Sequence, residues 1–431
     1  MLRPAIAVLA ALLLTSVTTA NDWTRFRGPG GAGVVEGPDI PTSWSSSENL
    51  KWRTPLPGKG SSSPVVAGDR VYVTCYTGYG EQLEEPGNPE DLVRHLIALD
   101  KQSGRELWRA SIASEGKQDP YRGFLTQHGY ASSTPVTDGD AVYVLFGKSG
   151  LLAFDRDGKQ LWQVDVGQQS DPAQWGDASS PILAGNLVIV DAGILGNRFV
   201  AIDKQTGDVV WEIKDPSFTN SWATPVEHPT DDGLQVLVHV PKKVMAIDPQ
   251  QGQVVWSAAS PLEDAACGSI VTHDGVAYLM GSRAGRALAL RCGGSGDVTG
   301  ANTVWSRAMR SGIATPVIVG ENMYWQSGGI FYAADLKTGE YVYRERLPRL
   351  GGPTGGFPNA DYSSAIAVGE KIVQFTRNGE SYVIAAGDEF EVLGHNPAFD
   401  GDSSAFSATP AVSDGELFVR SDEFLYCISA D

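Results

Sequence analysis

The sequence predicts an all-β fold, an eight-bladed β-propeller made of four-stranded antiparallel blades. Two recurring motifs support this prediction. The first resembles AIDKQTGDVVW (201–211), and the second, which precedes it each time, resembles SSPVVAGDRVYV (62–73). Copies follow one another at intervals of about 45 residues, a length typical of one propeller blade. The 50 Gly and 25 Pro residues are spread along the chain, as turns between many short strands require.

The second motif marks the start of each blade. Its landmark residues are Pro64, Pro135, Pro181, Pro225, Ile270, Pro316, Ala365 and Pro410. Each unit then contains four short strands, and the last of them carries a Trp or another apolar residue. Alternating apolar residues and β-branched content favour strands over helices. A four-stranded unit repeated around a ring is a propeller blade.

The two ends of the repeat region are predicted to combine in one blade. The last unit stops at FLYCISAD, after its third strand, whereas ENLKWRTPLP, which contains Trp52, precedes the first unit. Residues 49–57 are therefore expected to complete blade eight, which removes an open sheet edge. The predicted organisation is a signal peptide at 1–20, an N-terminal arm at 21–48 and the propeller at 49–431.

The first twenty residues have the features of a removable signal peptide. Arg3 precedes the apolar run 5–14, and small residues at 18–20 offer a cleavage site. A run of about ten apolar residues is too short to span a bilayer, although a retained interfacial anchor is the alternative. We therefore expect an exported protein, periplasmic or extracellular, without a transmembrane segment and with a possible association with the cell envelope. The net charge of −18 argues against nucleic-acid binding.

Within AIDKQTGDVVW each landmark residue has an expected structural role. Asp203 caps the turn, Gly207 supplies a positive φ, and Trp211 packs between neighbouring blades. The recurrence of the Trp position on the outermost strand favours blade docking over ligand binding. The equivalent positions are Trp52, Trp108, Trp162, Trp211, Trp256, Trp305, Tyr343 and Leu393.

The pattern Ala-x-Asp-x-x-x-Gly-x-x-x-Trp resembles the tryptophan-docking motif of the pyrroloquinoline-quinone-like (PQQ-like) propeller repeats. These repeats occur in quinoprotein alcohol dehydrogenases and in BamB, the outer-membrane assembly scaffold. The resemblance covers nearly the whole chain after residue 20 and implies the same fold. The segment WTRFRGPGGAG (23–33) also resembles the start of secreted bacterial propellers of this superfamily.

Quinone dehydrogenases of this family carry adjacent cysteines beside the quinone and a catalytic Ca²⁺. Here the four cysteines are scattered, at Cys75, Cys267, Cys292 and Cys427, and closely spaced carboxylates occur only at 155–157 and 400–402. We therefore expect no catalytic residue, no metal and no cofactor, with PQQ and Ca²⁺ as the alternative. The cysteines are expected to be buried free thiols, although an oxidising compartment would also permit disulfides.

Two long insertions, 76–95 and 113–131, are predicted to lie on the same face of the ring. The segments that enter each innermost strand reach that face too, so it is the expected ligand or partner rim. The candidate rim residues are Arg122, His128, Tyr130, Trp175, Asp177, Trp222, Arg310 and Tyr362. Arg122 and Arg310 are candidates for an anionic group of the partner.

The function that these observations favour is an exported, non-catalytic binding or scaffold propeller of the BamB type. Its rim would hold a protein or peptide partner. The alternatives are a quinone-dependent oxidoreductase and, third, a carbohydrate-binding module that uses the aromatic rim. Fold alone does not choose among them.

Overall fold

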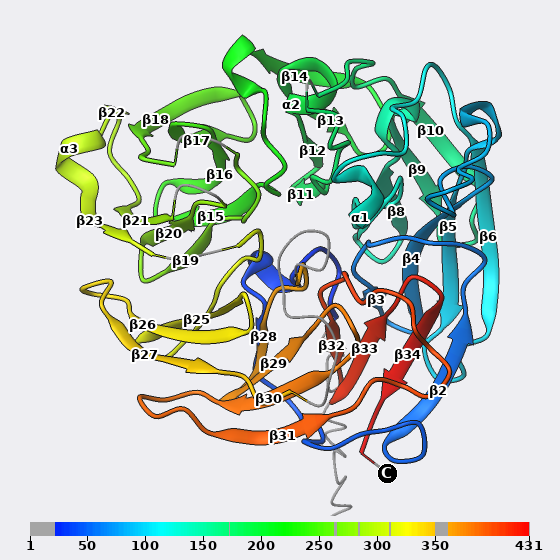
Figure 1. Cartoon of the computed structure of the whole chain (residues 1–431). Helices are drawn as coiled ribbons and strands as arrows, with labels where there is room; N and C mark the ends of the chain where they lie inside the picture. The colour runs from blue at the N-terminus through cyan, green and yellow to red at the C-terminus, as the bar shows by residue number, and fades with distance from the viewer. Residues whose placement is uncertain are drawn as a thin grey trace, which may run out of the picture.

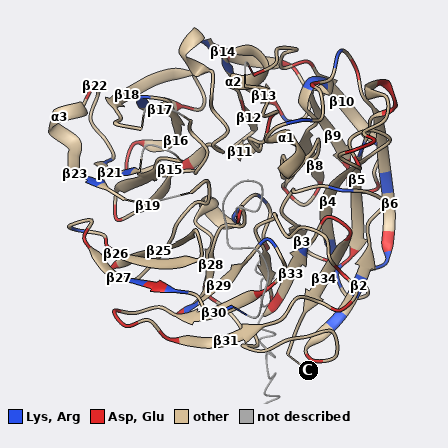
Figure 2. Ribbon diagram, in the orientation of Figure 1, with Lys and Arg blue, Asp and Glu red and all other residues tan. Residues whose placement is uncertain are grey.

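The structure is a computed structural model that describes residues 22–171, 173–262, 265–282, 285–309, 312–349 and 361–430. The signal peptide expected at 1–20 lies outside these residues. Eight antiparallel sheets surround a central axis, so the predicted eight-bladed propeller is confirmed (Figure 1). Most Lys, Arg, Asp and Glu residues lie along the outer strands and connecting loops (Figure 2).

The innermost strand of each blade is the first in the sequence, and the outermost is the last. Blade one comprises β3 (Val65–Ala67), β4 (Arg70–Thr77), β5 (Val93–Asp100) and β6 (Glu106–Ala113), and blade two comprises β7 (Val136–Thr137), β8 (Ala141–Leu145), β9 (Leu151–Asp155) and β10 (Gln160–Val164). Blade three comprises β11 (Ile182–Ala184), β12 (Leu187–Ala192), β13 (Arg198–Asp203) and β14 (Val209–Lys214). Blade four comprises β15 (Val226–Thr230), β16 (Gly233–Val240), β17 (Lys243–Asp248) and β18 (Gln253–Ala259).

Blades five to eight follow the same order, apart from the last strand. Blade five comprises β19 (Val271–His273), β20 (Val276–Met280), β21 (Arg286–Arg291) and β23 (Thr303–Ala308), and blade six comprises β24 (Val317–Val319), β25 (Asn322–Ser327), β26 (Ile330–Asp335) and β27 (Tyr341–Arg346). Blade seven comprises β28 (Ile366–Val368), β29 (Lys371–Phe375), β30 (Ser381–Ala385) and β31 (Val392–Asn396). Blade eight comprises β32 (Ala411–Ser413), β33 (Glu416–Arg420), β34 (Phe424–Ile428) and β2 (Leu50–Pro55).

The remaining elements are two extra strands and short helical turns in the connections. They are β1 (Val34–Val35), β22 (Gly296–Asp297), α1 (Leu125–His128), α2 (Gly193–Gly196), α3 (Thr299–Asn302), η1 (Pro29–Gly31), η2 (Pro89–Asp91), η3 (Gly147–Ser149) and η4 (Pro216–Phe218). None of the helices in the described ranges has the length and hydropathy that crossing a bilayer requires.

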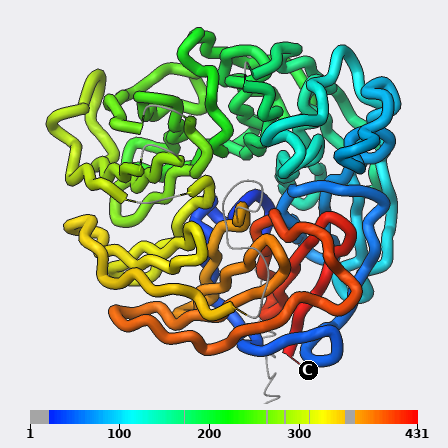
Figure 3. Tube along the Cα trace, in the orientation of Figure 1, coloured from blue at the N-terminus to red at the C-terminus, as the bar shows by residue number. Residues whose placement is uncertain are grey.

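Blade eight is completed by the N-terminal strand, as predicted. β2 pairs antiparallel with β34, with Trp52 opposite Cys427, and Figure 3 shows the blue segment that contains β2 beside the red C-terminal segment. Further polar contacts join blade eight to its neighbour, blade one. Lys101 Nζ donates to Ser413 Oγ at 2.9 Å, and Arg420 donates to the backbone oxygen of Thr74 at 2.6 Å.

The recurring Trp residues contact the next blade. Five indole N–H groups donate to backbone carbonyls there: Trp52 to Lys101, Trp108 to Arg156, Trp162 to Lys204, Trp211 to Pro249 and Trp305 to Leu336. Trp256 differs, since its indole donates to Gln235 Oε1 within its own blade and β22 runs alongside it. The ring of Tyr343 packs against Phe390, with 5.6 Å between the ring centroids.

The outer strand of blade seven is displaced by one residue from the sequence alignment. In the other blades a β-bulge immediately precedes the Trp position, which lies opposite a small residue such as Ala201. In blade seven the bulge falls at Leu393, and Gly394 lies opposite Val383. A side chain at 394 would meet the backbone oxygen of Thr42, because the N-terminal arm covers this place.

The N-terminal arm crosses the propeller axis. Trp23 forms a two-way backbone bridge with Val66 of β3, and further along the arm β1 pairs parallel with β28 of blade seven. Trp44 then stacks on Phe375, with ring centroids 6.1 Å apart. The arm thus joins blades one and seven and closes one end of the central channel at Phe26, which the sequence did not predict.

Two buried arginines fasten the arm inside the channel. Arg25 donates to the backbone oxygen of Pro225 at 2.8 Å and forms an ion pair with Glu227. The guanidinium of Arg27 donates to five backbone oxygens, at distances of 2.7–3.4 Å: Gly31, Ala32, Thr315, Pro316 and Ala365. All five N–H groups of an arginine can therefore be satisfied without a carboxylate. Burial lowers the pKa of Arg27 to about 9, so it remains charged at neutral pH.

Candidate functional site: an axial cavity and its rim

A cavity of about 480 Å³ lies on the axis, within the range of roughly 300–1,000 Å³ typical of small-molecule sites. It extends from Phe26 of the arm to aromatic residues of the connecting loops. Every blade contributes one hydroxyl from the residue preceding its landmark position. These hydroxyls belong to Ser63, Thr134, Ser180, Thr224, Ser269, Thr315, Ser364 and Thr409.

The eight hydroxyl residues form a belt that links blade to blade. The backbone N–H of Ser63 donates to Thr134 Oγ1 at 2.9 Å, and the N–H of Thr134 donates to Ser180 Oγ at 3.0 Å. The same contact is repeated between successive blades as far as Thr409, at 2.9–3.2 Å. Among the described residues, no belt hydroxyl donates its own proton to a protein acceptor, so these protons remain available to the cavity.

An aromatic wall borders one side of the cavity. The rings of Phe124 and Trp175 meet edge to face at a centroid distance of 4.8 Å, and Trp175 and Trp222 lie 5.0 Å apart. The wall is held in place by polar contacts. His128 Nε2 bonds to the backbone oxygen of Trp175 at 2.7 Å, and the Trp222 indole N–H donates to the backbone oxygen of Gly176, also at 2.7 Å.

The described lining of the cavity contains few ionisable side chains. Burial lowers the pKa of His128 to about 4, so this side chain is neutral at pH 7. Among the described residues that line the cavity, Asp361 is the only carboxylate and there is no Lys or Arg. Asp361 accepts from Gln326 Nε2 and from the backbone N–H of Arg377, both at 2.8 Å. Burial nevertheless raises its pKa.

The two blade-one insertions fold against each other beside this wall. Tyr76, Tyr79, Tyr121 and Tyr130 form one aromatic cluster, in which the backbone N–H of Tyr121 donates to the Tyr79 hydroxyl at 3.1 Å. The second insertion therefore lies between the cavity, which it lines with Phe124 and His128, and the first insertion.

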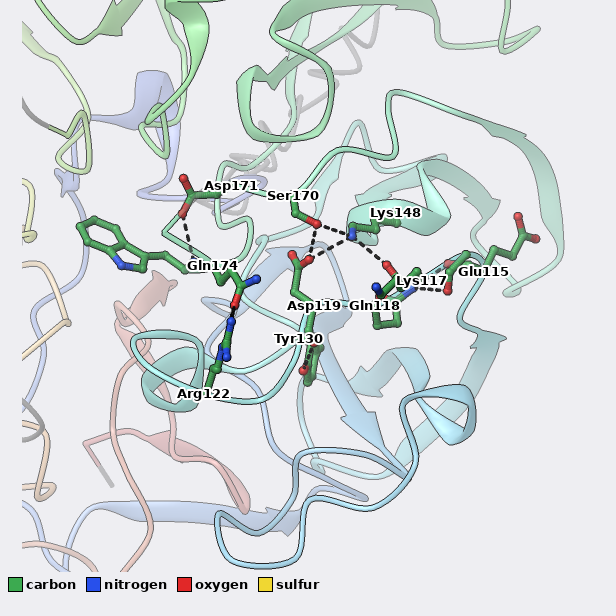
Figure 4. Close-up of polar contacts among 12 residues, drawn as sticks. Glu115, Lys117, Gln118, Asp119, Arg122, Tyr130, Lys148, Ser170, Asp171 and Gln174 are labelled. Carbon is green, nitrogen blue, oxygen red and sulfur yellow. Dashed lines mark hydrogen bonds and ion pairs between the residues drawn. The ribbon is translucent and has the colours of Figure 1, made fainter.

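Buried charges fix the second insertion to blades one and two. Arg94 donates to the backbone oxygen of Tyr130 at 2.8 Å and to Gln118 Oε1 at 3.1 Å. Lys148 Nζ contacts Asp119 Oδ1 at 3.0 Å and Ser170 Oγ at 2.7 Å (Figure 4). These contacts hold the second insertion against the two blades.

The structure brings four of the eight predicted rim residues to the cavity lining: His128, Trp175, Trp222 and Tyr362. Tyr130 and Asp177 instead line a separate recess of about 30 Å³ with Arg94 and Lys148. Burial raises the pKa of Asp177 to about 7.

Of the two predicted arginines, Arg122 is not among the residues that line the cavity. Arg122 lies on the exposed rim, where its Nε donates to Gln174 Oε1 at 2.6 Å (Figure 4). Arg310 lies outside the described residues. Sequence reasoning missed the hydroxyl belt and Phe26. The sequence did contain a signal for the belt, since a Ser or Thr precedes every landmark residue, as in SSTPV and SATPA.

The carboxylate pairs considered as metal ligands have other roles in the structure. Asp155 Oδ1 accepts the backbone N–H groups of Asp157 and Lys159 in a hairpin turn. Asp402 accepts the hydroxyl of Tyr426 at 2.7 Å. Within the described ranges no group of His, Cys, Asp or Glu is arranged to hold a metal ion.

The four cysteines are free thiols. Cys75 and Cys427 are buried, as expected, whereas Cys267 and Cys292 are partly exposed.

Fold and site together define a ring-shaped β-propeller with an axial cavity that is lined largely by hydroxyl and aromatic residues. The family described as "Outer membrane protein assembly factor BamB" matches residues 93–345, and the chain belongs to this family of PQQ-like propellers. The chain is 28% identical over 157 residues to outer membrane protein assembly factor BamB of Burkholderia pseudomallei, across 36% of this chain and 31% of that protein.

Two further proteins are similar. Quinoprotein alcohol dehydrogenase PedH of Pseudomonas putida is 30% identical over 141 residues, which cover 31% of this chain and 23% of PedH. Both curated relatives are thus matched over less than a third of their length. The crystal structure of BamB from Moraxella catarrhalis superposes with a TM-score of 0.61 at 13% identity, over 88% of this chain and 97% of that one. This likeness shows a shared fold.

Proposed function

We propose that the protein is an exported, non-catalytic scaffold that holds a protein or peptide partner on the rim built by its two blade-one loops. Membership of the BamB family supports a protein-binding role. The observation that carries the proposal is Leu83, whose side chain is 62% exposed at the tip of the first insertion. A large apolar side chain exposed at a loop tip is a suitable anchor for a partner.

The surroundings of Leu83 indicate the chemistry of the partner. Exposed carboxylates flank it at Glu81, Glu84 and Glu85, and further acids follow at Glu90 and Asp91. The net charge of the chain is −18. A partner surface with an apolar pocket and surrounding Lys or Arg residues complements this tip, and charge attraction speeds their encounter.

Site-specific crosslinking tests the proposal. A photo-crosslinking amino acid replaces Leu83 in the full chain, and the matched control places it at Val210, which is 50% exposed on the outer strand β14. We expect one partner to be captured from residue 83 and not from 210. Equal capture from both positions, or from neither, would contradict the proposal.

The captured partner then permits a direct measurement. Reversing the charge of Glu84 and Glu85 to Lys should weaken its affinity for the purified protein about tenfold, and raising the ionic strength should weaken the unmodified complex in the same direction. An affinity unchanged by both treatments would remove this rim from the interface.

A quinone-dependent oxidoreductase is the second candidate, favoured by the similarity to PedH. The described residues fit the quinone poorly, because PQQ is a polycarboxylate and the described cavity lining supplies no cation to pair with it. Adding PQQ and Ca²⁺ to the purified protein and measuring quinone absorbance and alcohol-dependent dye reduction tests this function. Saturable binding with turnover would establish the enzyme and contradict the non-catalytic scaffold.

A further inference from the structure

The hydroxyl belt of the axial cavity has hydrogen-bonding capacity that the contacts between blades do not use. Each belt hydroxyl from Thr134 to Thr409 accepts one hydrogen bond, from a backbone N–H of the preceding blade, and so uses one lone pair. A hydroxyl has one proton and two lone pairs, so each of these cavity-lining hydroxyls retains one donor and one acceptor site. The cavity floor is therefore a ring of groups that both donate and accept.

The walls add aromatic side chains to this ring of hydroxyls. Trp175 and Trp222 line the cavity from blades three and four, and Trp175 is positioned by the bond from His128 and by its own N–H to Asp171 Oδ2 at 3.1 Å. Tyr362 enters from blade seven, which faces blade three across an eight-membered ring. An aromatic face on one side and hydroxyls below suit a ligand with one apolar face and many hydroxyl groups.

Charge distinguishes between the ligands of suitable size. The arm closes one end of the cavity at Phe26, so a peptide would have to enter by a terminus, which is charged. The described lining has no cation to pair with a carboxylate, and its one carboxylate, Asp361, already accepts two hydrogen bonds. Burying an unpaired charge is costly. Neutral ligands are favoured over both peptide termini and anions.

We propose that the axial cavity binds a short, uncharged saccharide, with a sugar ring stacked on Trp175 and its hydroxyls bonded to the Ser and Thr belt. Sugar hydroxyls donate and accept at once, as the belt hydroxyls do. A cavity of about 480 Å³ accommodates a ligand of this size. This site is separate from the loop rim, so it does not depend on the proposed protein partner.

Titration of the full chain with sugars tests the proposal. Cellobiose, maltose, xylobiose, lactose and N,N′-diacetylchitobiose are added separately, and binding is followed by calorimetry and tryptophan fluorescence. We expect saturable binding of at least one neutral disaccharide and markedly weaker binding of its anionic counterpart, digalacturonate. If none of the neutral sugars binds at millimolar concentration, or if only digalacturonate binds, the proposal is wrong.

Variants place the bound sugar in the cavity. Trp175→Ala should weaken the affinity about tenfold, whereas Trp175→Phe, which keeps an aromatic face, should retain most of it. Tyr362→Phe removes one lining hydroxyl and should weaken the affinity about threefold to tenfold. Val210→Ala, on the exposed outer strand β14, is the control and should have no effect. Near-UV circular dichroism verifies that each variant is folded.

Two results would overturn the proposal even if a ligand is found. One is sugar binding that Trp175→Ala and Tyr362→Phe leave unchanged in folded protein, since the sugar would then lie elsewhere. The other is Trp175-dependent binding of a capped neutral peptide, acetyl-Ala-Gly-Ala-amide, without binding of any disaccharide. Loss of partner crosslinking at residue 83 would leave these measurements unaffected, so the two proposals fail separately.

Discussion

Gly207 of blade three lies against the indole ring of Trp162 of blade two. Its φ is 79°, and a Cβ at this position would come within 2.8 Å of Trp162 Cγ. The glycine of the repeat motif thus serves both the turn and the packing of the preceding Trp. We expect Gly207→Ala to lower the free energy of unfolding by about 2–4 kcal/mol, because backbone strain and a steric clash add together. Denaturant unfolding measures the change.

Gly275 offers a matched control for this substitution. Its φ is also positive, at 72°, but a Cβ there would have no neighbour within 4 Å. Gly275→Ala should therefore cost only the backbone strain, about 1 kcal/mol. Equal losses at the two positions would show that contact with Trp162 contributes nothing.

Thr134 is the first link of the hydroxyl belt. Thr134→Val keeps the shape of the side chain but leaves the buried N–H of Ser63 without its acceptor. An unsatisfied buried donor costs about 1–3 kcal/mol, so we expect a loss of this size in denaturant unfolding. Thr134→Ser, which retains the hydroxyl, should lose less than 1 kcal/mol by the same reasoning. If the valine variant is as stable as the serine variant, the hydrogen bond from Ser63 to Thr134 does not stabilise the protein.

The blade count and the closure at β2 followed from sequence because each blade repeats the same local chemistry. An Asp caps the turn, as Asp203 does for Gln205 and Thr206, and a Gly and an apolar plate follow. The predicted position of the outer-strand residue was wrong in the blade whose sequence departs from this motif. In blade seven no Trp marks the strand, and Leu393 was aligned one residue before the true position, Gly394.

The arm and the cavity were less accessible to sequence reasoning, for a physical reason. Arg27 binds backbone oxygens of residues roughly 300 positions away, and backbone oxygens carry no sequence signature. Trp175 and Trp222 could be predicted for the rim because they precede innermost strands. The sequence did not show that Tyr130, unlike these two residues, packs outside the cavity lining, because its contact with Tyr79 depends on how two irregular loops pack.

Arg27 is expected to be the principal fastening of the arm. Arg27→Met removes all five of its bonds to backbone oxygens and should destabilise the protein by about 3–5 kcal/mol. Arg27→Lys, a point charge with three donors, should recover only part of this loss. Arg105→Met, at an exposed turn, is the control and should change stability by less than about 0.5 kcal/mol. Thermal and urea unfolding of the three variants are compared. A methionine variant as stable as the Arg105 control would show that the arm is held by other contacts.

Asp191 should make the stability depend on pH. It is buried, and burial raises its pKa to about 7, although Ser221 and the N–H of Gly193 donate to its carboxylate. The usual pKa in an unfolded chain is about 3.9, so between pH 4 and 7 the folded state binds the extra proton. Stability from this group is therefore fully present below about pH 4 and is lost as the pH rises towards 7, by up to about 1.4 kcal/mol per pH unit.

Asp191→Asn isolates this contribution, because an amide keeps an acceptor for Gly193 and does not titrate. Urea unfolding of both proteins at pH 5, 6, 7 and 8 gives the free energy of unfolding at each pH. We expect the difference between variant and unmodified protein to shift in favour of the variant from pH 5 to 7 and to level off near pH 8. A difference that stays constant across this range would mean that Asp191 is ionised throughout, with its charge stabilised by Ser221 and the α2 backbone.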